Sequence, residues 1–251
     1  MTCLYFDYHA TTPVDPRVAD RVMHSMIKEF GNASSIDHSF GDEADNAVNE
    51  ANAHVARLVG SSPREVIFTS GATESINLAI QGSATTQDPY RIAVAPTEHK
   101  AVLDTCAALA KKKKAEIVWL KVDERAQLDL DHLEQVCQQG IHLICVMAAN
   151  NEVGTLYPIQ QIGRIAQQYG IPFLCDGSQA VGKIPINFAE WGITYLAISG
   201  HKLYAPKGVG ALVIKKGQTL EPLIYGGGHQ RGIRSGTLNV PGIVGLGEAC
   251  R

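Results

Sequence analysis

Short apolar runs alternate along most of the chain with longer stretches in which apolar residues recur every three or four positions. Runs of four to six residues that are rich in valine, isoleucine and leucine are typical of buried strands. They predict strands at Val66–Thr69, Arg91–Ala95, Glu116–Leu120, His142–Met147, Pro172–Cys175, Tyr195–Ser199 and Gly210–Ile214.

The stretches between most of these runs place their apolar residues on one face of a helix. We predict helices at Asp42–Val59, Thr73–Gln81, His99–Lys112, Asp129–Gln138 and Ile159–Tyr169. Because strands and helices alternate, the fold class is α/β: a mainly parallel seven-stranded sheet flanked by helices on both faces.

Composition narrows the class of protein. The chain has 251 residues, of which 45% are hydrophobic and 19% charged, and this suits one large domain or one and a half. A net charge of -3 gives no basic field for a polyanion, so direct nucleic-acid binding is not expected. The longest apolar runs fall short of the ~20 residues of a membrane span, and the start lacks the basic region of a signal peptide. We expect a soluble, cytoplasmic protein.

The cysteines do not predict a metal site. Six are present, and no two have the CxxC spacing of zinc or cluster ligands. Cys145 and Cys175 lie within apolar runs, which predicts that they act as small buried hydrophobic residues.

Ligands of an open parallel sheet bind beyond the carboxyl ends of its strands, so the residues that follow each strand carry the functional information. The first strand leads into Thr69–Ser75, a tight glycine turn and a helix start. Free N–H groups there would suit a phosphate. Taken alone, this segment is better explained as an ordinary turn, in which Ser70 or Thr73 could cap the helix.

Further polar residues follow the second and fourth strands. His99 begins a predicted helix, where it could stack on an aromatic ligand, transfer protons near neutral pH, or be merely structural. Asn150 and Asn151 could be turn residues or could hydrogen-bond a ligand.

An aspartate and a lysine follow the next two strands. Asp176 ends an apolar strand, where an unpaired carboxylate would cost several kcal/mol, so a cationic partner is expected. Lys202 follows the next strand and reaches the same edge of the sheet.

Together these groups meet the requirements of pyridoxal 5'-phosphate (PLP). The aldehyde of PLP needs an amine, and its pyridine nitrogen needs a carboxylate. Its ring needs a stacking partner, and its phosphate needs N–H donors. Lys202, Asp176, His99 and the helix start after Thr69 supply one of each.

Several segments of the chain resemble cysteine desulfurases of the NifS/IscS type, which are aspartate-aminotransferase-like (fold type I) PLP enzymes. The resemblance is carried by Tyr5–Pro13, Phe68–Ser75, Thr97–Lys100, Asn150–Gly154, Ser199–Lys202, Gly226–Gly232 and Arg234–Thr237.

The resemblance implies a role for each site residue. Lys202 would be the Schiff-base lysine and proton carrier, and Asp176 would pair with the pyridine nitrogen. His99 would stack on the ring, with Gln179 on its hydroxyl and Asn151 beside the substrate. The phosphate would be held by Ala72, Thr73, Ser199 and His201.

The resemblance also implies a homodimer, because Thr237 would reach the phosphate of a neighbouring subunit. The segment that ends at Thr237, residues 226–237, has few apolar residues, which predicts little packing on its own core.

The implied reaction removes sulfur from L-cysteine and leaves alanine. The sulfur passes as a persulfide to an iron–sulfur scaffold or a tRNA-thiolation acceptor. In the family, the nucleophilic cysteine and the arginine that binds the substrate carboxylate lie past the position of Arg251. We expect an N-terminal segment (1–15) and a PLP-binding large domain (16–251), without the small domain, and the chain alone would be inactive. A PLP-dependent C–S lyase and a non-catalytic partner subunit are the alternatives.

Overall fold

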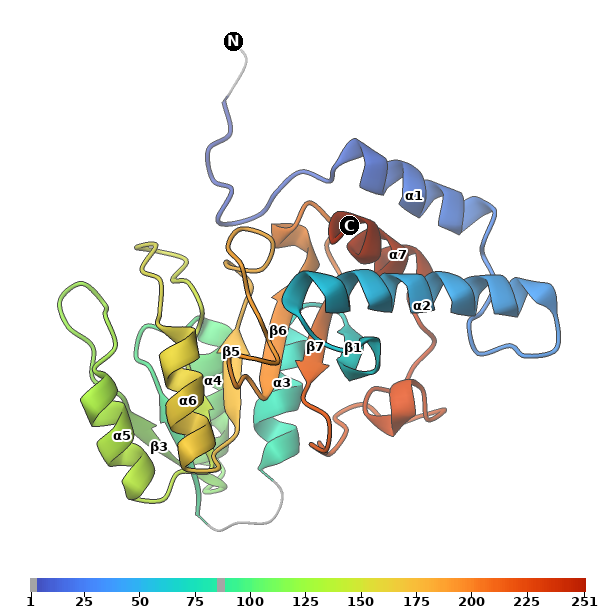
Figure 1. The fold of residues 1–251 in the computed structure, drawn as a ribbon. Helices are drawn as coiled ribbons and strands as arrows, with labels where there is room; N and C mark the ends of the chain where they lie inside the picture. The colour runs from blue at the N-terminus through green and yellow to red at the C-terminus, as the bar shows by residue number, and fades with distance from the viewer. Residues whose placement is uncertain (1–3, 85–88) are drawn as a thin grey trace.

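Residues 4–84 and 89–251 are described in the computed structural model of the chain, which Figure 1 shows as a layered α/β fold. Seven strands form one sheet in the order β1-β7-β6-β5-β4-β2-β3. The strands are β1 (Val66–Thr69), β2 (Tyr90–Val94), β3 (Ala115–Trp119), β4 (Leu143–Cys145), β5 (Phe173–Asp176), β6 (Tyr195–Ser199) and β7 (Gly210–Ile214). The α-helices are α1 (Pro16–Ile27), α2 (Ser39–Val59), α3 (Ala72–Ser83), α4 (Lys100–Lys111), α5 (Leu130–Gln138), α6 (Ile159–Gln168) and α7 (Val240–Ala249).

The strand directions confirm the predicted, mainly parallel sheet. β2 pairs in parallel with β3 and β4, β4 with β5, and β5 with β6. Only β7 runs against its two neighbours, β6 and β1. The chain moves outward from β2 to β3 and then returns past β2 to β4, so the strand order reverses between β2 and β4. Ligands of open α/β sheets bind beside such a reversal.

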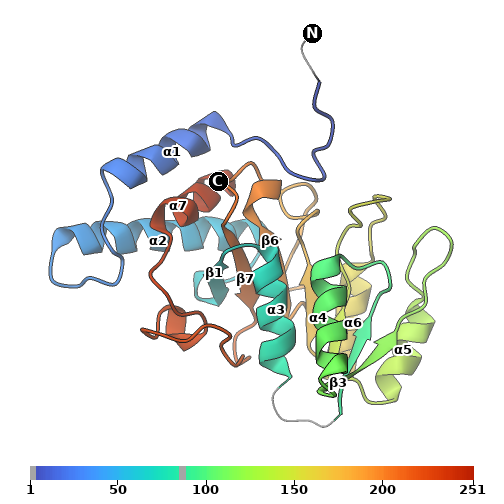
Figure 2. The ribbon, with the colours of Figure 1, turned by 180° about the vertical axis from the view of Figure 1, so that it is seen from behind.

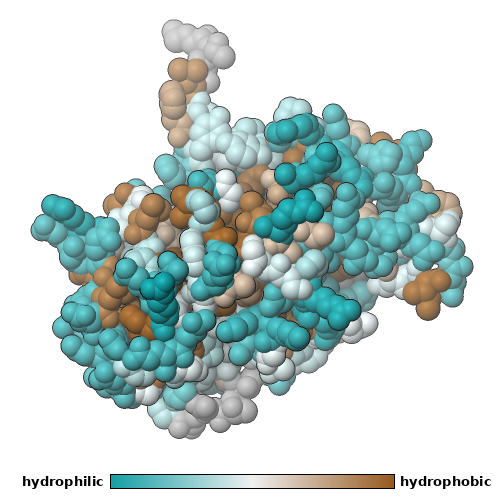
Figure 3. Space-filling view, viewed as in Figure 1, coloured by the Kyte–Doolittle hydropathy of each residue, from teal (hydrophilic) through white to brown (hydrophobic). Residues whose placement is uncertain are grey.

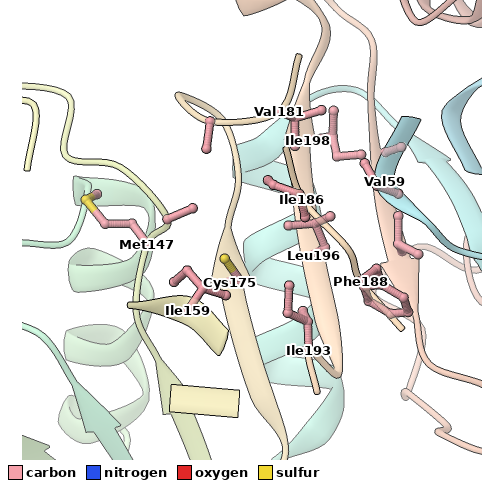
Figure 4. Packing of buried hydrophobic residues seen from close by; sticks show 14 of the residues in the cluster. Val59, Met147, Ile159, Cys175, Val181, Ile186, Phe188, Ile193, Leu196 and Ile198 are labelled. Atoms are coloured by element: carbon pink, nitrogen blue, oxygen red, sulfur yellow. The ribbon is translucent and has the colours of Figure 1, made fainter. Parts of the chain in front are cut away.

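Helices cover both faces of the sheet and bury a separate apolar cluster on each. Figure 2 shows α3 and α4 on one face, where their apolar residues pack in a cluster around Ile92 and Leu143. The other face packs against α2, α5 and α6. Figure 4 shows part of that second cluster, in which Phe188 lies beside Val59. Side chains on both faces of the sheet are therefore buried, which explains why the strands are continuous apolar runs in the sequence.

Two helices fall outside the strand–helix alternation. α1 and α7 pack against each other, and α7 also packs on α2 (Figure 1). α1 was not among the predicted helices, and it buries only Val18 and Ser25. Among the helices of the described ranges, none combines the length and apolar character that crossing a bilayer requires.

The predicted boundaries agree with the structure to within a few residues. β1, β6 and β7 have the predicted bounds, and α2 begins three residues earlier than expected. β4 is the clearest difference, because His142–Met147 was predicted and only Leu143–Cys145 is strand. The ladder to β2 ends there, since the Met147 N–H donates to the Glu98 carboxylate and not to a neighbouring strand.

Candidate functional site

A cavity of about 730 Å³ lies at the carboxyl ends of the parallel strands. Of the ten residues predicted for the site, nine line it: Ala72, Thr73, His99, Asn151, Asp176, Gln179, Ser199, His201 and Lys202. The tenth, Thr237, is exposed and lies outside this lining. The sheet therefore brings together predicted site residues that are far apart in the chain, of which Ala72 and Lys202 are separated by 130 residues.

One wall of the cavity is the first turn of α3. Its N-cap is Gly71, at φ 152°, and no side chain caps the helix, so the expectation that Ser70 or Thr73 caps it was wrong. Gly71 has no side chain that could cap the helix. Gly71, Ala72 and Thr73 all line the cavity. A Cβ at Gly210 of β7 would lie 2.6 Å from the Gly71 Cα, so glycine is needed there for this close approach. Uncapped N–H groups at a helix start favour an anion.

Asp176 ends β5 and is 6% exposed. Its Oδ1 accepts a hydrogen bond from the Ser178 N–H at 2.9 Å. The expected cationic partner is not in direct contact, because no ion pair among the described residues includes Asp176. The carboxylate thus lines the cavity with no cation in direct contact among the described residues, and a cationic ligand group there would be stabilised.

Lys202 ends the short 3-10 helix η2 (Gly200–Lys202), which follows β6 directly. Its Nζ donates a hydrogen bond to the backbone oxygen of His9. Burial lowers the pKa of Lys202, the charge of Lys183 lowers it further, and the charge of Asp176 opposes both. More of this amine is therefore neutral, and so nucleophilic, than in an exposed lysine.

His99 is the N-cap residue of α4, and its Nδ1 accepts a hydrogen bond from the Ala101 N–H at 3.1 Å. Because Nδ1 is an acceptor, the proton of the neutral ring is on Nε2. The structural interpretation of His99 as a helix cap is thus correct, and because His99 also lines the cavity, its role toward a ligand stays a prediction.

The two asparagines after β4 have different environments. Asn150 is 7% exposed, and its Oδ1 accepts from the N–H groups of Glu152 and Val153, as in an Asx turn. Asn151 lines the cavity, and its Nδ2 donates to Glu152 Oε1 at 2.7 Å. The turn interpretation is thus correct for Asn150, and Asn151 faces the cavity.

Sequence reasoning did not find that the N-terminal segment borders the cavity. Asp7, His9 and Ala10 line it. The backbone oxygen of His9 accepts from Gln179 Nε2 at 2.9 Å, and also from Lys202. The segment is anchored by the Thr12 N–H, which donates to the His201 oxygen at 3.0 Å. The signal was available, since residues 5–13 belong to a segment that carries the family resemblance.

Residues 226–237, the glycine-rich segment, are tied to β1 and α3 of this chain, and the expectation of little packing there was wrong. The Gln230 side chain accepts from the Phe68 N–H at 2.6 Å and donates to the Phe68 oxygen at 2.9 Å, so it pairs with edge strand β1 as a backbone would. Arg234 Nε lies 2.8 Å from Glu74 Oε1, on the first turn of α3. Polar anchors thus replace the apolar ones that the segment lacks.

None of the five cysteines in the described ranges lines the cavity. Cys145 and Cys175 are fully buried, as predicted. Cys250 is the C-cap residue of α7, and burial raises the pKa of its thiol to about 12. Cys3 lies outside the described residues. The residues described here therefore supply no reactive thiolate to the cavity.

The aminotransferase class-V family matches residues 4–251 of the chain. The cysteine desulfurase IscS of Anaeromyxobacter dehalogenans is 45% identical over 250 residues, which are 98% of this chain and 62% of that protein. Its counterpart in Rickettsia felis is 47% identical over 98% of this chain and 61% of that protein. The chain thus spans about three fifths of the length of these curated relatives.

Solved structures show the same fold. A NifS-like protein superposes with a TM-score of 0.95 at 40% identity, covering 99% of this chain and 69% of that one. A structure titled "SspA in complex with cysteine" gives a TM-score of 0.95 at 37% identity, over 99% of this chain and 72% of that one. With the family match and the arrangement of the cavity, they show that this chain belongs to the aminotransferase class-V family, in which it is similar to the NifS-like cysteine desulfurases.

Proposed function

We propose that residues 16–251 form the PLP-binding large domain of a cytoplasmic cysteine desulfurase, with residues 1–15 as an N-terminal segment that borders its site. One observation carries the proposal: a half-buried amine, a buried carboxylate, an imidazole and an uncapped helix start line one cavity. The names of the relatives and the cysteine complex of a similar protein support it.

The residues present fit PLP. The uncapped N–H groups of α3, with Ser199 and His201, would hold the phosphate. Asp176, which is buried and makes no ion pair among the described residues, would hold the proton on the pyridine nitrogen. When bound, PLP supplies an aldehyde that joins to amines and a ring that withdraws electrons from the adjacent carbon.

Lys202 would hold the cofactor covalently and later move a proton. Its lowered pKa leaves part of the amine neutral, as attack on an aldehyde requires. The hydrogen bond from Nζ to the His9 oxygen would have to break for that attack. With the substrate bound, the Lys202 amine would be the group placed to take and return the Cα proton.

His99 and Gln179 would orient the ring. The Ala101 N–H fixes the edge of the imidazole, so its face and the Nε2 proton are available to a ligand. Gln179 Nε2 donates a hydrogen bond to the His9 oxygen in this structure, and it would donate to the ring hydroxyl when PLP is bound. Asn151 would face the substrate from the opposite loop.

The proposed reaction takes sulfur from L-cysteine. The C–S bond of the substrate breaks, a thiolate of the enzyme forms an S–S bond with the departing sulfur, and the substrate carbon receives a proton to give alanine. That thiolate must come from outside the described residues, since none of their cysteines lines the cavity. The sulfur would pass to an iron–sulfur scaffold or a tRNA-thiolation acceptor.

A PLP-dependent C–S lyase is a second candidate, and the same lack of a cavity thiol in the described ranges favours it. A lyase needs no protein thiol and converts cysteine with water into pyruvate, ammonia and sulfide. A non-catalytic partner subunit is less consistent with the structure, because Lys202, Asp176 and His99 would then have no reason to share a cavity.

Product analysis separates these candidates. A longer form of the protein that supplies the nucleophilic cysteine, incubated with PLP, L-cysteine and a reducing thiol, should yield alanine and sulfide in equal amounts, whereas residues 1–251 alone should yield little. Pyruvate and ammonia from residues 1–251 would identify a lyase. A longer form that carries the nucleophilic cysteine, binds PLP and makes neither alanine nor pyruvate would be the non-catalytic subunit.

We also propose a homodimer, in which Thr237 completes the partner's phosphate site. Thr237 is exposed and lies outside the cavity lining of its own subunit. Large apolar side chains are exposed on the N-terminal segment, where Figure 3 shows them on a projecting arm, and also at Ile36 and Tyr225. Sedimentation at micromolar concentration should give a dimer, and a PLP-loaded monomer would contradict this.

A further inference from the structure

A buried glutamate joins the two loops that flank the reversal of strand order. Glu98 follows β2 and is 5% exposed. Its Oε1 accepts a hydrogen bond from the Met147 N–H, which follows β4, at 2.5 Å. The cavity is lined by His99, next to Glu98, and by Met147, Ala149 and Asn151 on the other loop. One carboxyl thus connects the His99 side of the cavity to the Asn151 side.

The hydrogen bond between Glu98 and Met147 lies just past the end of the β2–β4 pairing, where no strand residue in the described part of the chain accepts from the Met147 N–H. The Ala95 N–H donates to the Cys145 oxygen at 3.2 Å, the last rung between the β2 and β4 chains in this direction. Met147 is 2% exposed, so without Glu98 its N–H would be buried and unpaired. A buried backbone N–H is almost always hydrogen-bonded in a stable fold, which gives the glutamate a structural reason to be here.

The surroundings of the carboxyl disfavour a negative charge. The other oxygen, Oε2, has no hydrogen-bond partner among the described residues. Burial and the charge of Asp176 raise the pKa of Glu98 well above its usual range. The titratable groups that act on it or respond to it are all neutral or anionic: Asp176, Cys106, Cys145, Cys175 and Tyr157.

We propose that Glu98 is a positioning residue that holds the His99 loop against the Met147 loop as a neutral carboxylic acid, so that Asp176 is the only charged member of the two buried carboxyls. This rests on the proposed function for the role of Asp176 toward PLP. The clamp needs only the carbonyl oxygen of the acid, which accepts from Met147, while the protonated oxygen adds no second anion near Asp176.

The charge state is tested in the cofactor-free protein. Its infrared spectrum at pH 7 should contain the carbonyl stretch of a protonated carboxylic acid. This band should vanish in Glu98→Gln and persist in Glu50→Gln, a control on the exposed face of α2. A wild-type spectrum without the band, or a band that survives in Glu98→Gln, would overturn the proposal. This result does not depend on whether PLP binds.

The positioning role is tested by PLP affinity. Glu98→Gln keeps the acceptor, the length and the neutrality, so its dissociation constant should stay within about threefold of wild type, whereas Glu98→Ala should weaken binding about tenfold or more. Glu98→Asp is too short to reach the Met147 N–H and should resemble Glu98→Ala. Strong binding by Glu98→Asp with weak binding by Glu98→Gln would show that an ionised group is required, and the proposal would be wrong. A wild-type protein that fails to bind PLP would instead refute the proposed function and leave the infrared result standing.

Discussion

Arg234 Nε lies 2.8 Å from Glu74 Oε1, and this ion pair fastens the glycine-rich segment to the first turn of α3. Glu74 lines the cavity and its Oε2 also accepts from the Ser70 N–H at 2.8 Å. The contact therefore links the segment that ends at Thr237 to the helix start proposed for the phosphate.

We expect Arg234→Met to lower the free energy of unfolding at pH 7 by about 1–3 kcal/mol, because it leaves a mostly buried carboxylate without its charged donor. Burial by itself would raise the pKa of Glu74, but the hydrogen bonds from Arg234 and Ser70 outweigh it and the pKa is lowered. The stabilisation is thus present above the unfolded-state pKa near 4.5 and is lost as pH falls through the folded-state value. Urea unfolding of both proteins from pH 7 to pH 3 should show the difference shrinking; a difference that grows in acid would contradict this assignment.

Asp176→Asn should retain the fold and still bind PLP, because the amide keeps the shape and can accept from the Ser178 N–H. The charge that holds the pyridine proton is lost, so exchange of the substrate Cα proton should slow by about 100-fold or more. Deuterium exchange into an amino acid, followed by NMR, measures this rate. An unchanged rate would remove Asp176 from the proposed role.

The stability of the protein should fall in mild acid partly because of His142. Its Nδ1 accepts from the Arg91 N–H at 2.8 Å, and its ring stacks on Tyr90 with centroids 5.5 Å apart. Burial and the charge of Arg91 lower the pKa of His142, so the unfolded chain binds more protons than the folded one. The stabilisation from the neutral His142 ring is present above pH ~6.5, the unfolded-state pKa, and declines as pH falls toward the folded-state pKa.

The measurement for His142 is chemical unfolding between pH 5 and pH 8. His142→Asn offers an amide oxygen to the Arg91 N–H but does not titrate, so it should be less stable than wild type at pH 8 and lose less stability between pH 8 and pH 5. An identical pH dependence in the two proteins would show that His142 is not responsible.

Cys250 should not transfer sulfur. Its thiol pKa of about 12 leaves very little thiolate at neutral pH, and it lies outside the cavity lining. Alkylation of Cys250 in the folded protein at pH 7 should therefore be slow and should become fast in denaturant. Cys250→Ser should leave any alanine production unchanged, and loss of that activity would mean that the thiol reaches the substrate.

The sequence predicted the sheet and most of the cavity because both depend on local pattern. Apolar runs bounded by Asp176 and Lys202 mark strand ends, and strand ends of a parallel sheet meet at one edge. The contribution of His9 could not be found this way, because it depends on how an irregular segment lies across that edge. Glu98 was overlooked because its importance lies in its burial and in one bond to Met147, neither of which has a sequence signature.

The most direct test of the account is to locate the covalent bond between PLP and the protein. The protein is incubated with PLP, reduced with borohydride and mapped by mass spectrometry. We predict one modified residue, Lys202, with the label lost in Lys202→Ala and retained in Lys216→Ala, whose lysine is exposed and lies outside the cavity lining. Two results would contradict the central claim that this cavity is a PLP site built on Lys202. One is a Lys202→Ala variant that is labelled as strongly as the wild-type protein, and the other is a wild-type protein in which only a different lysine is labelled.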